Sequence, residues 1–209
     1  LFIFEEPYLG SMFEKTSYDQ IYDEHIFMFS ASSVQKICLL FDMELIDILK
    51  QETHGGSLRY VCARKNVYKV KTNVNYFIDK EKKNNLDNIH SCFEFKKNCE
   101  NSKKNLKEKL LKLKEDNKKI CGYAATSKST TILNYCNIGT EIIDFICDTT
   151  PEKIGKFSPG MHIPIKPINY FHENYPDIAF LFAWNHKEEI FEKEKEFSQK
   201  GKWVAHVEL

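Results

Sequence analysis

The 209-residue sequence predicts an α/β fold: the end of a mixed sheet, a helical connector, and a second, doubly wound unit built on a parallel sheet. Two observations support this prediction. Residues 78–117 are rich in lysine and asparagine and poor in apolar side chains, and the residues after them alternate between continuous apolar runs and segments of helical periodicity. We therefore expect three regions, over residues 1–77, 78–117 and 118–209.

The opening residues 1–4 form an apolar, strand-like run. The run ends at Glu5-Glu6-Pro7, and the proline indicates a strand that leaves a sheet into a loop. Because the chain opens inside this run and without methionine, we expect further polypeptide upstream.

A helix and two strands are predicted next. Apolar positions over residues 34–41 have helical spacing, and Ser32 and Ser33 are available to cap the helix start. Residues 43–48 and 58–63 are predicted to form two strands, which is a plausible end to a mixed sheet.

The connector, residues 78–117, is predicted to be a long, solvated helix. A lysine-rich patch for nucleic acid is the alternative, but acidic residues interleave with the lysines, which favours ion pairs one turn apart on an exposed helix.

Strands and helices alternate regularly after the connector. Continuous apolar strands in this pattern favour a parallel sheet covered on both faces. We predict strands over residues 119–125, 142–147, 178–184 and 203–207, and helices over residues 129–136 and 187–199.

Composition excludes several classes of protein. Apolar residues make up 42% of the chain and charged residues 29%, which is the balance of a globular protein, and the formal net charge of zero argues against nucleic-acid binding. The seven cysteines show no C-x-x-C pair, so no zinc site is expected in this chain. Without a bilayer-length apolar run or a signal peptide, we expect a cytoplasmic protein with no membrane partner.

The densest group of ionisable residues lies at residues 18–25 and includes Tyr22, Glu24 and His25. A histidine beside acids and phenols, followed by aromatic residues, is an arrangement that tunes imidazole for proton transfer near neutral pH. A surface turn with a hydrogen-bonded histidine is the alternative interpretation.

Two other clusters suggest ligand contacts. His54 precedes Gly55-Gly56, which allow a close backbone approach, although a hairpin turn needs the same glycines. Residues 122–131 lead from a strand through a hydroxyl-rich loop into a helix start, which is suited to cradle a phosphate. Asp148 ends the following strand, a common place for a ribose-binding acid or for a helix cap or turn residue.

Together these motifs resemble the sugar C-methyltransferases that use S-adenosylmethionine. The ordered matches cover nearly the whole chain except the connector. They lie at residues 4–9, 18–25, 29–30, 54–59, 122–134, 148, 153–156, 158–165, 183–185 and 188–190.

The resemblance implies a fold and a reaction. Residues 1–77 are expected to be the C-terminal part of a Rossmann-like methyltransferase domain, and residues 118–209 an α/β domain that helps to hold the substrate. Members of this family transfer a methyl group from S-adenosylmethionine to the carbon beside the ketone of a nucleotide-linked deoxysugar, after a base has formed the enolate.

The resemblance also implies roles for individual residues. The family's Tyr-x-Glu-His stretch matches Tyr22, Glu24 and His25, with His25 as the base, Glu24 orienting or polarising the site, and Tyr22 donating a hydrogen bond to the sugar or its phosphate. The expected substrate-binding residues are Ser127, Lys128, Thr130, His54 and Asn185.

The family's glycine-rich donor loop and its cysteine-rich zinc domain are not in this sequence. S-adenosylmethionine is therefore expected to be bound mainly by polypeptide upstream, and zinc only in an N-terminal domain. The alternative hypothesis is a non-catalytic nucleotide-sugar binding module or a degenerate methyltransferase relative. A nicotinamide-dependent oxidoreductase domain is disfavoured because residues 122–125 lack the spaced glycines that a pyrophosphate requires.

Overall fold

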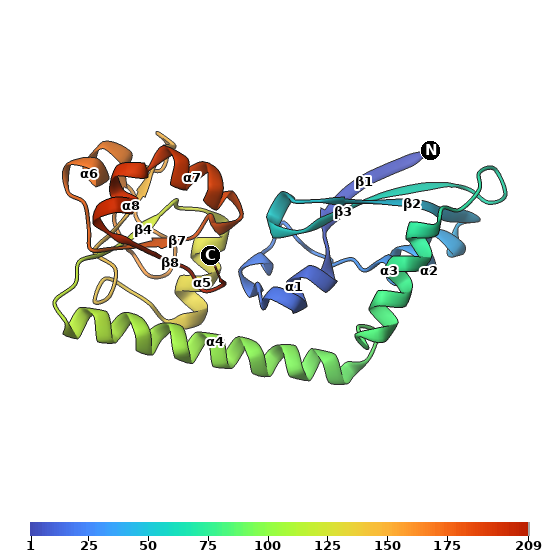
Figure 1. Cartoon of the computed structure of the whole chain (residues 1–209), viewed down its shortest axis with the longest axis horizontal. Coiled ribbons are helices and arrows are strands. Elements are labelled where there is room, and N and C mark those ends of the chain that lie inside the picture. Colours follow the sequence, from blue (N-terminus) through green and yellow to red (C-terminus); the bar gives the residue numbers. More distant parts are fainter. Residues whose placement is uncertain (209) are drawn as a thin grey trace. The chain divides into compact units, whose positions relative to one another are not determined.

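The computed structural model describes residues 1–208, which form two compact units, and the protein is α/β (Figure 1). Unit 1 comprises residues 1–17 and 23–98, and unit 2 comprises residues 18–22 and those from residue 99 onwards. The short segment 18–22 is therefore part of unit 2, although the chain on both sides of it belongs to unit 1.

Unit 1 is built on a small antiparallel sheet. Strands β1 (Phe2–Pro7), β2 (Met43–Gln51) and β3 (Ser57–Arg64) lie in the order β1-β3-β2, and both outer strands run antiparallel to β3 (Figure 1). The predicted strands are confirmed, and β1 ends at Pro7, within the Glu5-Glu6-Pro7 stretch where the run was expected to end. An edge strand tolerates this proline because its outer side has no ladder partner to lose.

Helices α2 (Ala31–Leu40) and α3 (Thr72–Lys83) pack on this sheet and bury its core. The helix α1 (Leu9–Lys15) follows β1. The apolar side chains that α2, α3 and the strands share in this core are Ala31, Val34, Cys38, Leu45, Ile48, Leu58, Tyr60, Cys62, Val74 and Ile78.

The cap of α2 differs from the prediction. Ser30, and not Ser32 or Ser33, is the N-cap: its hydroxyl accepts the Ser33 N–H at 3.0 Å, and the Ser33 hydroxyl accepts the Ser30 N–H at 2.9 Å. This reciprocal capping box satisfies two amides that a helix start leaves unpaired. The helix therefore begins one residue earlier than its apolar periodicity suggests.

The predicted helical connector consists of two helices, α3 and the 27-residue α4 (Ile89–Glu115). The first part of α4 belongs to unit 1, and the part from Cys99 onwards belongs to unit 2. Leu106 and Leu110 are buried there, while the charged positions face solvent, as the interleaved lysines and acids indicate.

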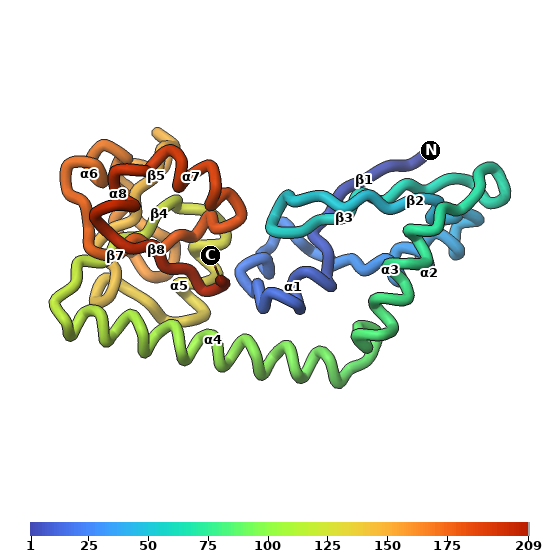
Figure 2. Tube along the Cα trace, in the orientation of Figure 1, coloured from blue at the N-terminus to red at the C-terminus, as the bar shows by residue number. Residues whose placement is uncertain are grey.

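Unit 2 contains a five-stranded parallel sheet in the order β6-β5-β4-β7-β8 (Figure 2). The chain builds outward from β4 to β5 and β6, and then returns to the other side of β4 with β7 and β8. In such sheets ligands bind outside the carboxyl ends of the strands, where the order reverses. The strands are β4 (Ile120–Tyr123), β5 (Phe145–Asp148), β6 (Ile165–Pro167), β7 (Ile178–Leu181) and β8 (Lys202–Val204).

The helices of unit 2 confirm one prediction and correct another. Helix α5 (Ser127–Cys136) lies where predicted, but the single helix expected over residues 187–199 is two, α7 (Lys187–Lys193) and α8 (Lys195–Lys200). Glu194 breaks it with non-helical backbone angles, and its buried carboxylate accepts the Tyr123 hydroxyl at 2.8 Å. The short strand β6 and helix α6 (Ile168–Glu173) were not predicted.

Gly122 in the central strand β4 leaves room for its neighbours. A Cβ there would lie 2.6 Å from Phe182 Cε2 and 3.0 Å from Ile146 Cγ1. We expect Gly122→Ala to lower the free energy of unfolding by about 1–3 kcal/mol through overpacking. Urea denaturation measures this loss, and combining the change with Phe182→Leu tests its cause: the two losses should be less than additive, whereas simple additivity would contradict the steric explanation.

Candidate functional site

His25 lies against two residues from distant parts of unit 1. Its Nδ1 is 3.7 Å from Glu6 Oε2, and its ring meets the His54 ring edge to face with centroids 5.5 Å apart. Only 9% of the His25 side chain is exposed. An imidazole placed beside a carboxylate is a candidate for proton transfer.

The backbone around His54 explains how its ring reaches His25. His54, Gly55 and Gly56 all have positive φ angles, of 55°, 81° and 134°. They form the turn between β2 and β3, and a Cβ on Gly56 would approach Ser11 Oγ to 2.6 Å. The same turn therefore contains both the glycines and the histidine that contacts His25.

Glu5 and Glu6 are adjacent on β1 but have different partners. Glu5 accepts hydrogen bonds from Thr53 Oγ1 at 2.6 Å and from Arg59 Nη2 at 2.8 Å, and these bonds hold the pKa of its carboxyl below the usual range. Glu5 thus ties the β2–β3 turn to β1, and Glu6 is the acid beside His25. Sequence reasoning did not assign Glu6 a role; its position at the end of a strand was the available signal.

The three predicted catalytic residues differ in burial and in the unit to which they belong. Glu24 lies in a turn beside His25 with an exposed side chain. Tyr22 is half-buried and is the last residue of the segment that belongs to unit 2. Their predicted roles remain predictions.

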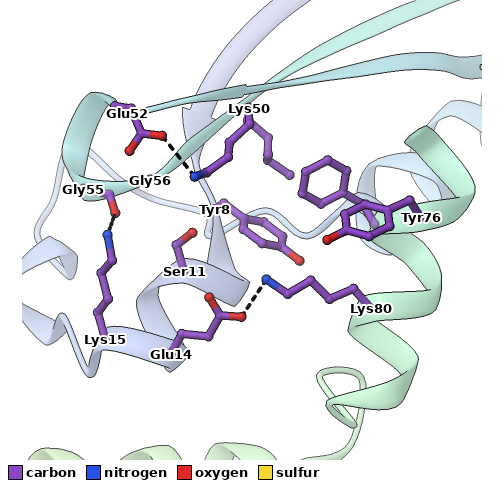
Figure 3. A pocket seen from close by; sticks show the side chains of 12 residues that line it. Tyr8, Ser11, Glu14, Lys15, Lys50, Glu52, Gly55, Gly56, Tyr76 and Lys80 are labelled. Carbon is purple, nitrogen blue, oxygen red and sulfur yellow. Dashed lines mark hydrogen bonds and ion pairs between the residues drawn. The ribbon is translucent and has the colours of Figure 1, made fainter. Parts of the chain in front are cut away.

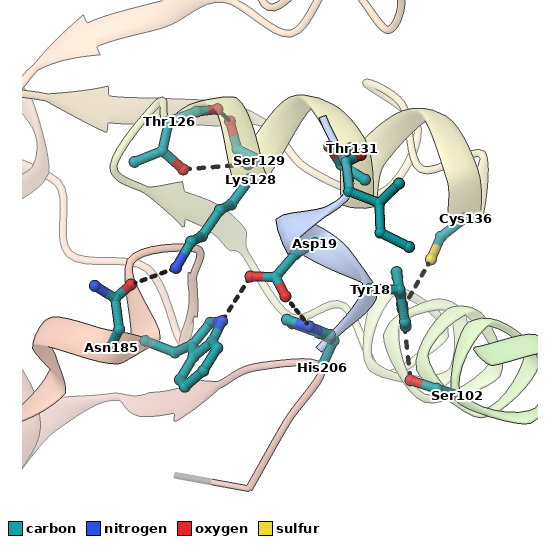
Figure 4. A network of polar contacts seen from close by, with 12 residues as sticks. Tyr18, Asp19, Ser102, Thr126, Lys128, Ser129, Thr131, Cys136, Asn185 and His206 are labelled. Atoms are coloured by element: carbon teal, nitrogen blue, oxygen red, sulfur yellow. Dashed lines mark hydrogen bonds and ion pairs between the residues drawn. The ribbon is translucent and has the colours of Figure 1, made fainter. Parts of the chain in front are cut away.

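The predicted substrate-binding residues Lys128 and Asn185 meet in unit 2 (Figure 4). The Lys128 ammonium donates to Asn185 Oδ1 at 2.9 Å and lies 5.0 Å from the centre of the Trp184 ring. Trp184 in turn donates its indole N–H to Asp19 Oδ2 at 2.7 Å. Lys128 is itself buried, so it reaches the carboxyl-end edge of the sheet from within the unit.

The other predicted substrate ligands are placed differently. Ser127 is exposed at the first turn of α5, and Thr130 is half-buried on the same helix. Thr126 caps this helix, because its hydroxyl accepts the Ser129 N–H at 3.2 Å. His54 belongs to unit 1, whereas Ser127, Thr130, Lys128 and Asn185 belong to unit 2.

Asp148 fixes the loop before α5. Its Oδ2 accepts the Ala125 N–H and its Oδ1 accepts the Thr150 N–H, each at 2.7 Å. Burial alone raises the pKa of this carboxyl, but these bonds and Lys153, 3.5 Å away, lower it overall. Ala124 has a φ of 72°, a conformation that is unfavourable for alanine. The hydrogen bonds to Asp148 therefore hold the loop in a strained backbone conformation.

Asp19 is the carboxylate at the centre of the network in unit 2 (Figure 4). It contacts His206 Nε2 at 3.1 Å as well as the Trp184 indole, and the Asp19 and His206 side chains are fully buried. Burial by itself would raise the Asp19 pKa, but the hydrogen bond and charge of His206, the charge of Lys128 and the bond from Trp184 lower it overall. Sequence reasoning did not select Asp19 or His206.

The lowered pKa of Asp19 predicts how stability changes with pH. The unfolded carboxyl, with its usual pKa of about 3.9, takes up a proton first as the pH falls, so this stabilisation is present above about pH 4 and is lost as the pH drops through the folded-state pKa. We expect the urea midpoint of the wild type to fall more between pH 6 and pH 3 than that of Asp19→Asn. Equal falls in both proteins would contradict this assignment.

A pocket of about 230 Å³ opens in unit 1 between α1, the β2–β3 turn and α3 (Figure 3). Three lysines on its wall already have partners: Lys80 pairs with Glu14 at 2.7 Å, Lys50 with Glu52 at 3.0 Å, and Lys15 with the Gly55 carbonyl. Aromatic side chains, including Tyr8 and Tyr76, form the rest of the wall.

Two features are absent from the described residues. Within residues 1–208, no group of three or more His, Cys, Asp or Glu side chains is arranged to hold a metal ion. In the same part of the chain, no helix has both the length and the apolar character needed to cross a membrane.

Comparison with known proteins gives two findings. Residues 52–207 match the family described as the C-methyltransferase C-terminal domain. The chain is also similar to the C-methyltransferase NovU of Streptomyces niveus, with 31% identity over 205 residues that cover 96% of this chain and 48% of NovU. The chain thus spans about half the length of this curated relative.

Proposed function

Because this chain belongs to the C-methyltransferase C-terminal domain family, we propose that it is part of an enzyme that methylates a nucleotide-linked keto-deoxysugar. The methyl group is transferred from S-adenosylmethionine to the carbon beside the ketone. The observation that carries the proposal is the buried His25, held beside Glu6 and against His54 within the Tyr-x-Glu-His stretch. We assign residues 1–77 to the end of a Rossmann-like methyltransferase domain and residues 118–209 to a doubly wound α/β domain.

His25 is the proposed general base. The proton on a carbon beside a ketone is only weakly acidic, so its removal needs a base at hydrogen-bond distance and a donor for the enolate oxygen. Because Glu6 Oε2 lies 3.7 Å from Nδ1, Nε2 is the proposed atom that takes the proton. Tyr22 donates a hydrogen bond to the sugar or its phosphate, and Glu24 orients the site.

The pocket described in unit 1 does not fit S-adenosylmethionine. The pocket of unit 1, at about 230 Å³, is smaller than the roughly 300 Å³ lower limit of small-molecule sites, and its lysines do not suit a cationic sulfonium. Since the chain spans about half of NovU, we assign the donor site to the rest of the gene product. The donor supplies the methyl group that replaces the abstracted proton.

The nucleotide part of the substrate is assigned to the carboxyl-end edge of the unit 2 sheet. Lys128, Ser127 and Thr130 lie in the first half of α5, where the helix dipole favours a phosphate. Asn185, which follows β7, already contacts Lys128 at 2.9 Å. These two elements flank the reversal of strand order.

Proton exchange tests the base without requiring methyl transfer. The full-length gene product is incubated in D₂O with a nucleotide-linked keto-deoxysugar and no methyl donor, and proton NMR follows the signal of the carbon beside the ketone. We expect enzyme-dependent loss of this signal with the wild type and with His90→Gln, an exposed control. Binding of the sugar without any exchange would contradict the enzyme proposal and favour a binding module.

A further inference from the structure

Asp19, near the start of the cluster of ionisable residues 18–25, is held by two partners from unit 2. Its carboxylate accepts the Trp184 indole N–H at 2.7 Å on one oxygen and meets His206 Nε2 at 3.1 Å on the other (Figure 4). A fully buried carboxylate is stable only when it is paired and hydrogen-bonded, so each of these two partners matters.

The residues on either side of Asp19 are also held by unit 2. The Tyr18 hydroxyl lies 3.4 Å from Cys136 Sγ on α5, and the Ile21 carbonyl accepts a long hydrogen bond of 3.5 Å from Thr131 on the same helix. Tyr18 is buried. The short helix η1 (Tyr18–Gln20) is thus packed along α5.

The place that Asp19 occupies is one where parallel sheets bind ligands. Trp184 lies three residues beyond the end of β7, and His206 lies two residues beyond the end of β8. The Asp19 carboxylate is therefore at the carboxyl-end edge of the sheet, next to the reversal of strand order.

We propose that Asp19 is a positioning residue, which anchors residues 18–21 within unit 2 and thereby fixes Tyr22, the proposed hydrogen-bond donor to the sugar or its phosphate. The anchoring follows from the contacts of Asp19, whereas its importance for catalysis rests on the function proposed above. The chain passes into unit 1 directly after Tyr22.

The two tryptophans of the chain provide a matched test. Trp184 donates its indole N–H to Asp19, and Trp203, in the same unit, donates its indole N–H to Ser198 at 3.0 Å. Each tryptophan is replaced by phenylalanine in the full-length gene product, and hydrogen–deuterium exchange is followed by mass spectrometry.

We expect Trp184→Phe to speed exchange of the amides of residues 18–22 by about tenfold or more, because it removes a hydrogen bond to a charged acceptor. Trp203→Phe should change them less than twofold. Equal effects of both variants, or none of Trp184→Phe, would overturn the proposal. If Trp184→Phe also removes the protection of β4, His206→Gln, which acts on the other carboxylate oxygen, gives the deciding measurement.

Kinetics separate positioning from a role in proton transfer. We expect Trp184→Phe to lower kcat by about tenfold while the pH of half-maximal rate stays unchanged, because His25 remains the base. A shifted pH profile would contradict a purely positioning role. If the wild type transfers no methyl group, the proposed function fails, and the exchange experiment still decides the anchoring by Asp19.

Discussion

His25→Gln is expected to lower the rate of methyl transfer by about 10²- to 10⁴-fold, the usual contribution of a general base. Glutamine keeps a polar side chain of similar size but cannot accept the proton. Because His25 contacts Glu6 and His54 within unit 1, the loss should fall on kcat, with little change in the KM for the sugar.

Two variants sharpen this measurement. Glu6→Gln keeps the base but removes the charge 3.7 Å from Nδ1, so we expect a smaller loss, of about tenfold. His90→Gln, on an exposed turn of α4, should leave the rate unchanged. A His25→Gln protein with at least a tenth of the wild-type kcat would rule out His25 as the base.

Glu81→Ala is expected to lower the free energy of unfolding of unit 1 by about 3 kcal/mol, the upper range for hydrogen bonds to a charged group. Glu81 lies on α3, is 2% exposed, and accepts the Ala31 N–H at 2.6 Å and the Ser32 N–H at 2.9 Å. It therefore places a negative charge at the N-terminus of α2, where the helix dipole favours one.

The position of Glu81 connects this stability to the site. Helix α2 begins six residues after His25, and the Phe29 carbonyl between them accepts the Leu9 N–H at 2.9 Å. Loss of Glu81 should thus loosen the α2 start, which hydrogen exchange of the α2 amides measures alongside urea denaturation. Glu94→Ala removes an exposed glutamate of α4 and serves as the control. Equal urea midpoints for the two variants would contradict the role given to Glu81.

The sequence was sufficient for the family, the α/β class and most of the strands and helices. Periodicity finds an element such as α5 because its buried face recurs along the chain itself. The family predicted from the ordered motifs is confirmed by the match over residues 52–207.

The errors have local physical causes. Ser30 caps α2 through a reciprocal bond with Ser33. Because serines also stand at positions 32 and 33, residue type alone did not identify which serine caps the helix. Glu194 breaks the predicted last helix because its side chain bonds Tyr123, 71 residues away. Such long-range partners leave no trace in local periodicity.

The candidate site was predicted only in part, because some of its residues are recognised only through long-range partners. Tyr22, Glu24 and His25 are adjacent in sequence and stand out as a motif, whereas Glu6 and Asp19 gain their interest from distant partners. Asp19 and His206 are 187 residues apart. Only the folded chain shows that one carboxylate lies beside His25 and that the other is held by two partners from unit 2.

The most direct test of the account is methyl transfer by the full-length gene product. The protein is incubated with S-adenosylmethionine carrying a ¹³C-labelled methyl group and with nucleotide-linked keto-deoxysugars, and NMR locates the label in the product. We predict a new carbon–carbon bond at the carbon beside the ketone, formed by the wild type and nearly abolished in His25→Gln. A label on oxygen or nitrogen, or no transfer to any of these sugars despite measurable sugar binding, would contradict it.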